Sequence, residues 1–280
     1  MAVRKAWAAV FVLVTALYVA SAGRAQDKPE ASRGRAGGEG ARTFVDAQRL
    51  FYNGQYRAAA DLAQTSLGSA PDDLAVYELR TSALHFQLRR AMGDAEDRDK
   101  AFRQCATCPA ILAEFRADIA RGQTLARNRL KASPAEDVAS FFLGKIDLNH
   151  VWLHLGTLGQ KTGWSEYWEA RRTLDAVLKR NPGHVRARVA RAWIDYIVET
   201  KVPWGFRWVL GGGNKKRALA TVQTAAAADA DFFVRTEAGF SLWEMLIRER
   251  RFKEAADTAR VLARDFPDNQ ELAKFIATHK

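Results

Sequence analysis

Two histidines four residues apart are the first candidates for chemistry in this sequence. His150 and His154 fall on one face of a predicted helix, and Asp147 lies three residues before the first of them. A zinc protease would need a glutamate directly after the first histidine, where Val151 stands, and no obvious third ligand lies nearby. We therefore expect no metal site. We expect both histidines to line a helix surface or to pack beside Trp152.

The only two cysteines form the motif Cys105-x-x-Cys108, which is followed by Pro109. In an exported protein this spacing favours a disulfide between Cys105 and Cys108. The alternative is a redox-active pair, because Pro109 can open a helix and place Cys108 at its N-terminus, where a thiolate is stabilised. The motif lacks the histidine of a c-type haem attachment site and has no βαβ context. We expect a structural disulfide.

Three consecutive glycines, residues 211–213, precede Asn214, Lys215 and Lys216. The spacing is not that of a P-loop, and the glycines follow a loop rather than a predicted strand. Asn214 is the expected N-cap of the next helix. The alternative is that the first amides of that helix, together with Lys215 and Lys216, receive an anion.

The segment that precedes these glycines, residues 201–210, is both aromatic and basic. Its candidate binding residues are Trp204, Phe206, Arg207 and Trp208. A connection of this length and composition must cover something. It covers the groove of its own fold, closes over a small ligand, or contacts a membrane surface. We take these four residues, with Lys215 and Lys216, as the predicted site for an anionic or amphipathic partner.

Positive charge gathers around the same segment. The chain has a net charge of +11, and removal of Arg4, Lys5 and Arg24 would leave +8. Residues 168–217 contain twelve Lys and Arg against four Asp and Glu, so this window alone carries the excess. A solvated helix face also explains such a run. No Ser-His-Asp order, paired-carboxylate motif or dinucleotide fingerprint appears, so we expect no enzyme and no cofactor.

The first residues have the three parts of a signal peptide. Arg4 and Lys5 precede an apolar run of residues 6–20, and small residues follow up to Ala25. The run is too short for a membrane-spanning helix, so we expect an exported, periplasmic or secreted protein that is not integral to the membrane. Residues 1–25 are the predicted signal peptide, and residues 26–41, which are poor in apolar side chains, are a predicted disordered tether. Residues 42–280 are the predicted folded domain.

Helical periodicity dominates this domain, and one pattern recurs three times. In each unit an alanine stands twelve residues before a proline, as the pairs Ala59 and Pro71, Ala170 and Pro182, and Ala255 and Pro267 show. The alanine lets two helices approach closely, and the proline follows the end of a helix that cannot continue. An aromatic residue opens the second helix of each pair. We expect five of these residues to be buried between helices: Tyr56, Ala59, Ala170, Phe252 and Ala255.

These units resemble the tetratricopeptide repeat (TPR). The resemblance implies an all-α fold, a right-handed α-solenoid of helix pairs with a concave surface, and no catalytic residues. Residues 193–219 are also similar to exported repeat proteins found beside bacterial envelope systems and, more distantly, to the T component of TRAP-type solute uptake systems.

Three functions are consistent with these observations. The first is a scaffold or adaptor in the cell envelope that binds a protein or peptide partner along its concave face. The second is a periplasmic small-ligand-binding component associated with solute uptake, with the aromatic segment as its lid. The third is a redox protein that uses Cys105 and Cys108. Export makes a nucleic-acid partner remote, so the sequence favours the scaffold.

Overall fold

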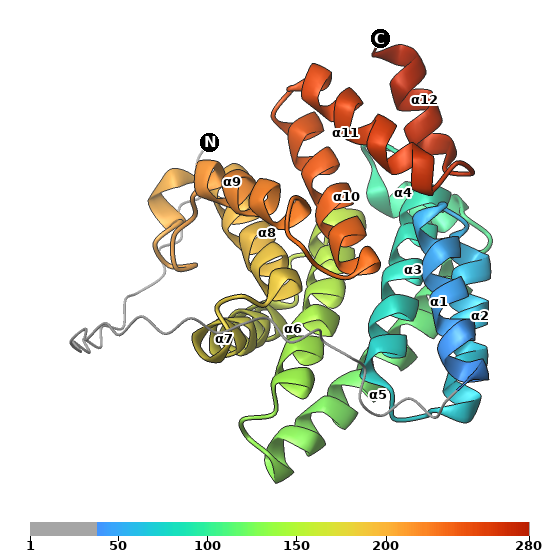
Figure 1. Cartoon of the computed structure of the whole chain (residues 1–280), viewed down its shortest axis with the longest axis vertical. Coiled ribbons are helices and arrows are strands. Elements are labelled where there is room, and N and C mark those ends of the chain that lie inside the picture. The colour runs from blue at the N-terminus through green and yellow to red at the C-terminus, as the bar shows by residue number, and fades with distance from the viewer. Residues whose placement is uncertain (1–37, 280) are drawn as a thin grey trace, which may run out of the picture.

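The computed structural model describes residues 38–279 (Figure 1). Within that range every regular element is helical and no β-strand occurs, which confirms the all-α fold class. The predicted signal peptide and residues 26–37 of the predicted tether lie outside the described residues. The first helix begins at Glu39, three residues before the domain start that we expected at residue 42.

The α-helices follow one another with short connections. In chain order they are α1 (Glu39–Tyr52), α2 (Tyr56–Ser69), α3 (Leu74–Met92), α4 (Arg98–Gln104), α5 (Cys108–Ala132), α6 (Asp137–Val151), α7 (Trp164–Arg180), α8 (Val185–Lys201), α9 (Lys215–Ala226), α10 (Phe232–Arg248), α11 (Phe252–Asp265) and α12 (Gln270–Thr278). A π-helical segment, η1 (Trp152–Thr157), extends α6, and a 3-10 turn, η2 (Trp204–Phe206), lies between α8 and α9. Apart from the short α4, each helix packs against the next one, so the fold is an all-α solenoid of helix pairs.

The repeated prolines act at helix ends as the sequence predicts. Helices α2, α7 and α11 each stop two residues before a proline of the repeat pattern. Two residues after Pro71, Asp73 caps α3 by accepting a hydrogen bond from the amide of Ala75 at 2.9 Å. Asn269 has the same place in the last unit and accepts from the amide of Glu271 at 3.0 Å. These local signals therefore set the boundaries between pairs.

Four of the five repeat residues that the sequence predicts to be buried are buried in the structure. Tyr56, Ala59, Ala170 and Ala255 are buried. Phe252 is 40% exposed, so its predicted burial is wrong. Tyr56 packs against Phe86 of the following helix, which is 19 residues long. The helix that follows α11, the helix of Phe252, is α12. It has 9 residues and covers less of the Phe252 ring.

The two ends of the solenoid meet. The ring of Tyr52, at the end of α1, packs 5.2 Å from Phe240 of α10 and 5.4 Å from Phe266, which follows α11. Asn269 donates a hydrogen bond to the carbonyl oxygen of Tyr52 at 2.7 Å. Figure 1 shows the start of α12 beside the first helix pair. The array therefore curves until its last unit packs against its first.

An ion network connects four helices of this curved array. Four helices contribute one residue each: Glu78 from α3, Lys145 from α6, Arg186 from α8 and Glu237 from α10. Glu237 pairs with Lys145 at 2.5 Å and with Arg186 at 2.5 Å, and Glu78 pairs with Arg186 at 3.1 Å. The four helices converge closely enough for their side chains to touch. These ion pairs link helices that lie far apart in the sequence.

Candidate functional site

The predicted binding segment forms the connection between α8 and α9 and protrudes into solvent. The exposed fraction is 84% for Trp204, 65% for Phe206, 77% for Trp208 and 48% for Val209. We call these four residues the aromatic tip. At such exposures the rings cover neither a ligand cavity nor a groove of the fold. The segment therefore presents apolar surface that no described residue covers.

The ends of this connection, in contrast, are firmly held. Arg171 of α7 donates hydrogen bonds to the carbonyl oxygens of Leu210 at 2.8 Å and Gly211 at 3.0 Å. The hydroxyl of Tyr167 donates to the same Leu210 oxygen at 2.9 Å. Gly211 has a φ of 79°, and a Cβ atom there would lie 2.5 Å from the Arg171 guanidinium. A larger residue at position 211 would be strained at this φ and would displace the Arg171 guanidinium.

The start of α9 is already satisfied by protein groups. Asn214 is its N-cap and accepts a hydrogen bond from the amide of Arg217 at 2.8 Å. The carboxylate of Glu199 accepts from the amide of Lys215 at 2.9 Å, which is where an anion would otherwise bind. The Lys215 ammonium group pairs with Glu249 at 2.7 Å. Of the two predicted lysines, only Lys216 is exposed without an ion pair to any residue from 38 to 279.

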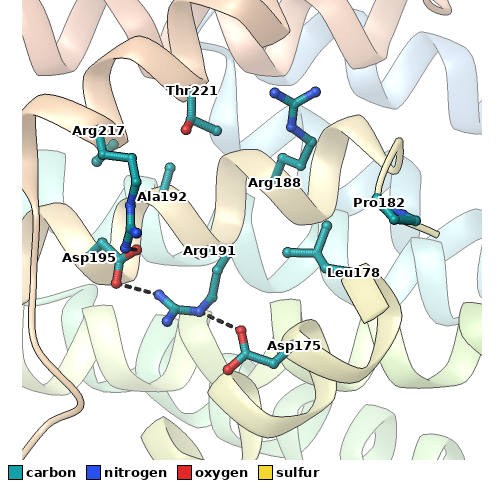
Figure 2. A pocket seen from close by; sticks show the side chains of 10 residues that line it. Asp175, Leu178, Pro182, Arg188, Arg191, Ala192, Asp195, Arg217 and Thr221 are labelled. Carbon is teal, nitrogen blue, oxygen red and sulfur yellow. Dashed lines mark hydrogen bonds and ion pairs between the residues drawn. The ribbon is translucent and has the colours of Figure 1, made fainter. Parts of the chain in front are cut away.

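A hollow of about 350 Å³ lies beside this connection, between α7, α8 and α9 (Figure 2). Its apolar part is formed by Leu178, Pro182, Ala192 and Ala218. Its basic part is formed by Arg188, Arg191 and Arg217, with Asp175, Asp195 and Thr221 completing the lining. We call it the arginine hollow. The sequence showed the excess of basic residues here, but not which of them are paired.

The three arginines of the hollow differ in what they bind. Arg191 lies between two carboxylates, 2.7 Å from Asp175 and 2.6 Å from Asp195. Burial alone would lower the pKa of Arg191, but these carboxylates raise it. Arg217 pairs with Asp195 at 3.3 Å and is 68% exposed. Arg188 forms no ion pair with any residue from 38 to 279, so its guanidinium is available to a ligand.

The two histidines that the sequence marks as possible metal ligands pack against each other. The rings of His150 and His154 are 4.4 Å apart, and His154 Nδ1 lies 2.7 Å from the side-chain oxygen of Gln160. The π-helical turn η1 carries His154 and leaves it buried. Burial, and then the neighbouring His154, lower the pKa of His150. In the part of the chain that the structure describes, no group of three or more His, Cys, Asp or Glu could hold a metal ion.

Asp147, the acidic member of that motif, faces a different helix. It is fully buried, and one of its carboxyl oxygens accepts a hydrogen bond from Gln123 of α5 at 2.7 Å. The other oxygen has no hydrogen-bond partner among residues 38–279. Burial, and then the nearby Glu169, raise the pKa of Asp147 to about 8. The group is therefore a largely protonated core carboxyl, and it is unsuited to ligate a metal with the histidines.

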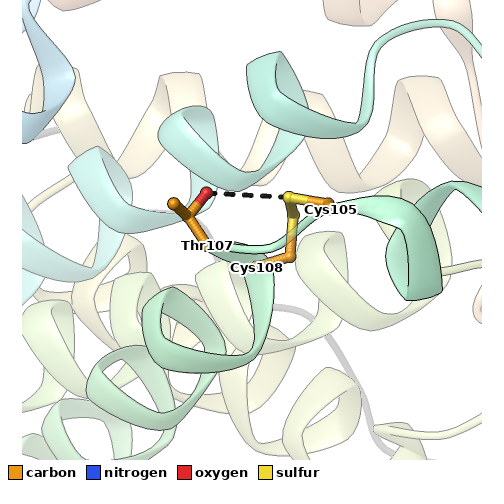
Figure 3. Close-up of a disulfide and its surroundings, with 3 residues drawn as sticks. All are labelled: Cys105, Thr107 and Cys108. Atoms are coloured by element: carbon orange, nitrogen blue, oxygen red, sulfur yellow. Dashed lines mark hydrogen bonds between the residues drawn. A yellow bond between two sulfur atoms is a disulfide. The ribbon is translucent and has the colours of Figure 1, made fainter.

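Cys105 and Cys108 are joined by a disulfide at the start of α5 (Figure 3). Cys108 is the first residue of the helix and is buried, whereas Cys105 is partly exposed. The Thr107 hydroxyl lies 3.7 Å from the Cys105 sulfur atom. The bridge closes the turn that connects α4 to α5.

Comparison with known proteins identifies a similar solved structure but no family. No family model and no curated protein matches the chain. A solved thermophilic TPR protein of Thermus thermophilus is similar at 15% identity with a TM-score of 0.45, over 86% of this chain and 98% of that one. This likeness concerns the fold alone. Among the described helices, none has both the length and the apolar composition needed to cross a bilayer.

Proposed function

We propose that the protein is an exported, non-catalytic scaffold of the TPR type that binds a protein partner in the cell envelope. The observation that carries the proposal is the arginine hollow, which combines an apolar floor with the unpaired Arg188. Arginine presents a planar fork of donors that matches a carboxylate. A partner segment with an acidic side chain next to a small apolar one fits both features.

The shape of the hollow favours a polypeptide over a small ligand. Small-molecule sites bury most of the ligand surface, whereas this hollow is open between the three helices. The aromatic tip does not close it, because Trp204 and Trp208 are exposed and do not line it. A small-ligand role in solute uptake therefore has less support than a scaffold role.

Capture from an envelope extract with the chain that starts at Gln26 tests the proposal. We expect Arg188→Glu to abolish capture of the partner, because the introduced carboxylate would repel the acidic side chain of the partner. Arg264→Glu is the matched control, since it reverses one exposed arginine on the distant α11 and should leave capture intact. Equal recovery of every protein by wild type and Arg188→Glu would contradict the arginine hollow as the binding site.

The cell location needs a separate measurement. If the chain is exported, protein recovered from the periplasm or the medium should begin at Gln26, as N-terminal sequencing would show. Recovery of the intact N-terminus from the cytoplasm would contradict export and would leave the binding proposal standing.

A further inference from the structure

The aromatic tip is unlike the rest of the described surface. The other exposed large apolar residues are Val45, Val138, Trp164, Phe252 and Val261. These are scattered singly along the chain, as is normal for soluble domains. The aromatic tip places four such side chains within six residues. Contiguous exposed apolar surface of this kind marks a site of interaction.

The exposure results from the way in which the connection is built. Its two ends are anchored in the fold, because Val202 and Leu210 pack against the core cluster formed by α6, α7 and α8. Arg207 donates to the carbonyl oxygen of Val202 at 3.0 Å and so closes the turn. The Trp208 indole N–H donates to the carbonyl oxygen of Gly205 at 3.0 Å. Because this polar group is already satisfied inside the turn, the Trp208 ring can enter an apolar medium without losing a hydrogen bond.

The surroundings of the aromatic tip are positively charged. Residues 200–217 contain five Lys and Arg and no Asp or Glu. Three of these cations pair with carboxylates outside the window: Arg207 with Glu199, Lys215 with Glu249 and Arg217 with Asp195. Lys201 and Lys216 flank the connection, are exposed, and form no ion pair with any described residue. A protruding apolar tip within a basic rim matches the two layers of an anionic membrane surface, which has negative headgroups above hydrocarbon.

We propose that the aromatic tip inserts into the surface of an anionic lipid bilayer and attaches the scaffold to it. Tryptophan favours the boundary between headgroups and hydrocarbon, and the long stems of lysine let the ammonium groups stay among the headgroups. The attachment is peripheral. It does not depend on the protein partner proposed for the arginine hollow.

The size and shape of the tip favour a bilayer over a protein. Each tryptophan or phenylalanine side chain buries roughly 150–250 Å². Three of them fall short of the roughly 800 Å² per partner that a stable protein–protein interface buries. A protein would also need a pocket complementary to each protruding ring, whereas a bilayer surface accepts a convex tip of any outline.

Vesicle binding tests the inference directly. The chain that starts at Gln26 keeps every described residue and omits the apolar run of residues 6–20, which would itself bind lipid. It is sedimented with vesicles of equal phosphatidylcholine and phosphatidylglycerol and with vesicles of phosphatidylcholine alone. We expect binding to the anionic vesicles, with a blue shift of tryptophan emission. The Trp204→Ala/Trp208→Ala variant should lower the partition coefficient at least about tenfold.

Charge reversal tests the basic rim. Lys201→Glu/Lys216→Glu should weaken binding to anionic vesicles by at least about fivefold per residue and leave binding to neutral vesicles unchanged. Two variants on α11 and α12, outside the α8–α9 connection, serve as matched controls and should bind as wild type does. Phe252→Ala/Val261→Ala removes two exposed apolar side chains of α11, and Lys253→Glu/Lys274→Glu reverses two exposed lysines.

Two outcomes would overturn the inference. One is a wild-type chain that does not sediment with anionic vesicles. Crosslinking of the aromatic tip to a protein, without vesicle binding, would be such a case. The other is a Trp204→Ala/Trp208→Ala variant that binds as well as the wild type. Quenching of wild-type emission by brominated lipid reports the same contact without any variant. Arg188→Glu should keep vesicle binding while losing partner capture, so the two proposals can fail separately.

Discussion

Two carboxyl groups largely shielded from solvent have opposite pKa shifts because their neighbours differ. Burial alone would raise the pKa of Glu237, but Arg186 and then Lys145 lower it to about 2. Asp147 forms no ion pair with any described residue, and burial, followed by the nearby Glu169, raises its pKa to about 8. Glu237 thus stays charged between two cations, whereas Asp147 holds a proton inside the core.

The Asp147→Asn variant should change how stability depends on pH. The ordinary pKa of aspartate is 3.8 and that of buried Asp147 is about 8, so its stabilising contribution is complete below about pH 4. The contribution is lost as pH rises toward 8. Asparagine can accept the same hydrogen bond from Gln123 and does not titrate. The variant should match wild type near pH 4 and exceed its unfolding free energy by on the order of 2–5 kcal/mol at pH 8.

Urea unfolding at pH 4, 6 and 8 measures this difference. Asp229→Asn changes an exposed carboxyl on the surface and is the control. A difference between Asp147→Asn and wild type that does not vary with pH would mean that Asp147 is ionised in the folded chain.

Loss of the disulfide should have little effect on global stability. The bridge joins residues three apart in sequence, and a short closed loop restricts the unfolded chain only slightly. We expect Cys105→Ser combined with Cys108→Ala to cost at most about 2 kcal/mol. Alanine is chosen at position 108 because that side chain is buried. Loss of most of the unfolding free energy in urea, or on reduction of the wild type, would show that the bridge holds the fold together.

At the scale of elements, α7 depends on a small residue at its closest contact. Ala170 is fully buried in the cluster that α7 forms with α6 and α8. Ala170→Leu should overpack this contact and cost roughly 1–3 kcal/mol. Ala220→Leu, on an exposed position of α9, should change stability by less than about 0.5 kcal/mol. Similar midpoints for the two variants in thermal unfolding would mean that the repeat alignment fails at Ala170.

At the scale of the whole molecule, contact between the ends should couple distant helices. The ring of Tyr52 connects α1 to α10 and to Phe266 beyond α11. In an open solenoid, the loss of one terminal contact affects only neighbouring repeats. Here we expect Tyr52→Ala to increase amide hydrogen exchange both in α1 and in α10–α11.

Hydrogen exchange followed by mass spectrometry resolves these segments. Phe252→Ala, which truncates a partly exposed ring, is the control and should change exchange only near α11 and α12. If Tyr52→Ala raised exchange in α1 alone, the contact between the ends would contribute no cooperativity.

Local signals in the amino-acid order mark the ends of several helices and the small residues at which helices pack closely. Proline after α2, α7 and α11 and the N-caps Asp73, Asn214 and Asn269 act within a few residues. Their effects can therefore be read from local order. The aromatic and basic character of the α8–α9 connection was also visible, because composition does not depend on folding.

The curvature of the array and the identity of the free charged groups depend instead on contacts between distant segments. The contact between Asn269 and Tyr52 spans 217 residues, and that between Arg186 and Glu78 spans 108. The aromatic tip is exposed because Arg171, on another helix, holds the base of the connection. Arg188 is unpaired because the nearby carboxylates bind Arg191 and Arg217. Such outcomes depend on the sum of small rotations between helix pairs, which no local pattern in the sequence specifies.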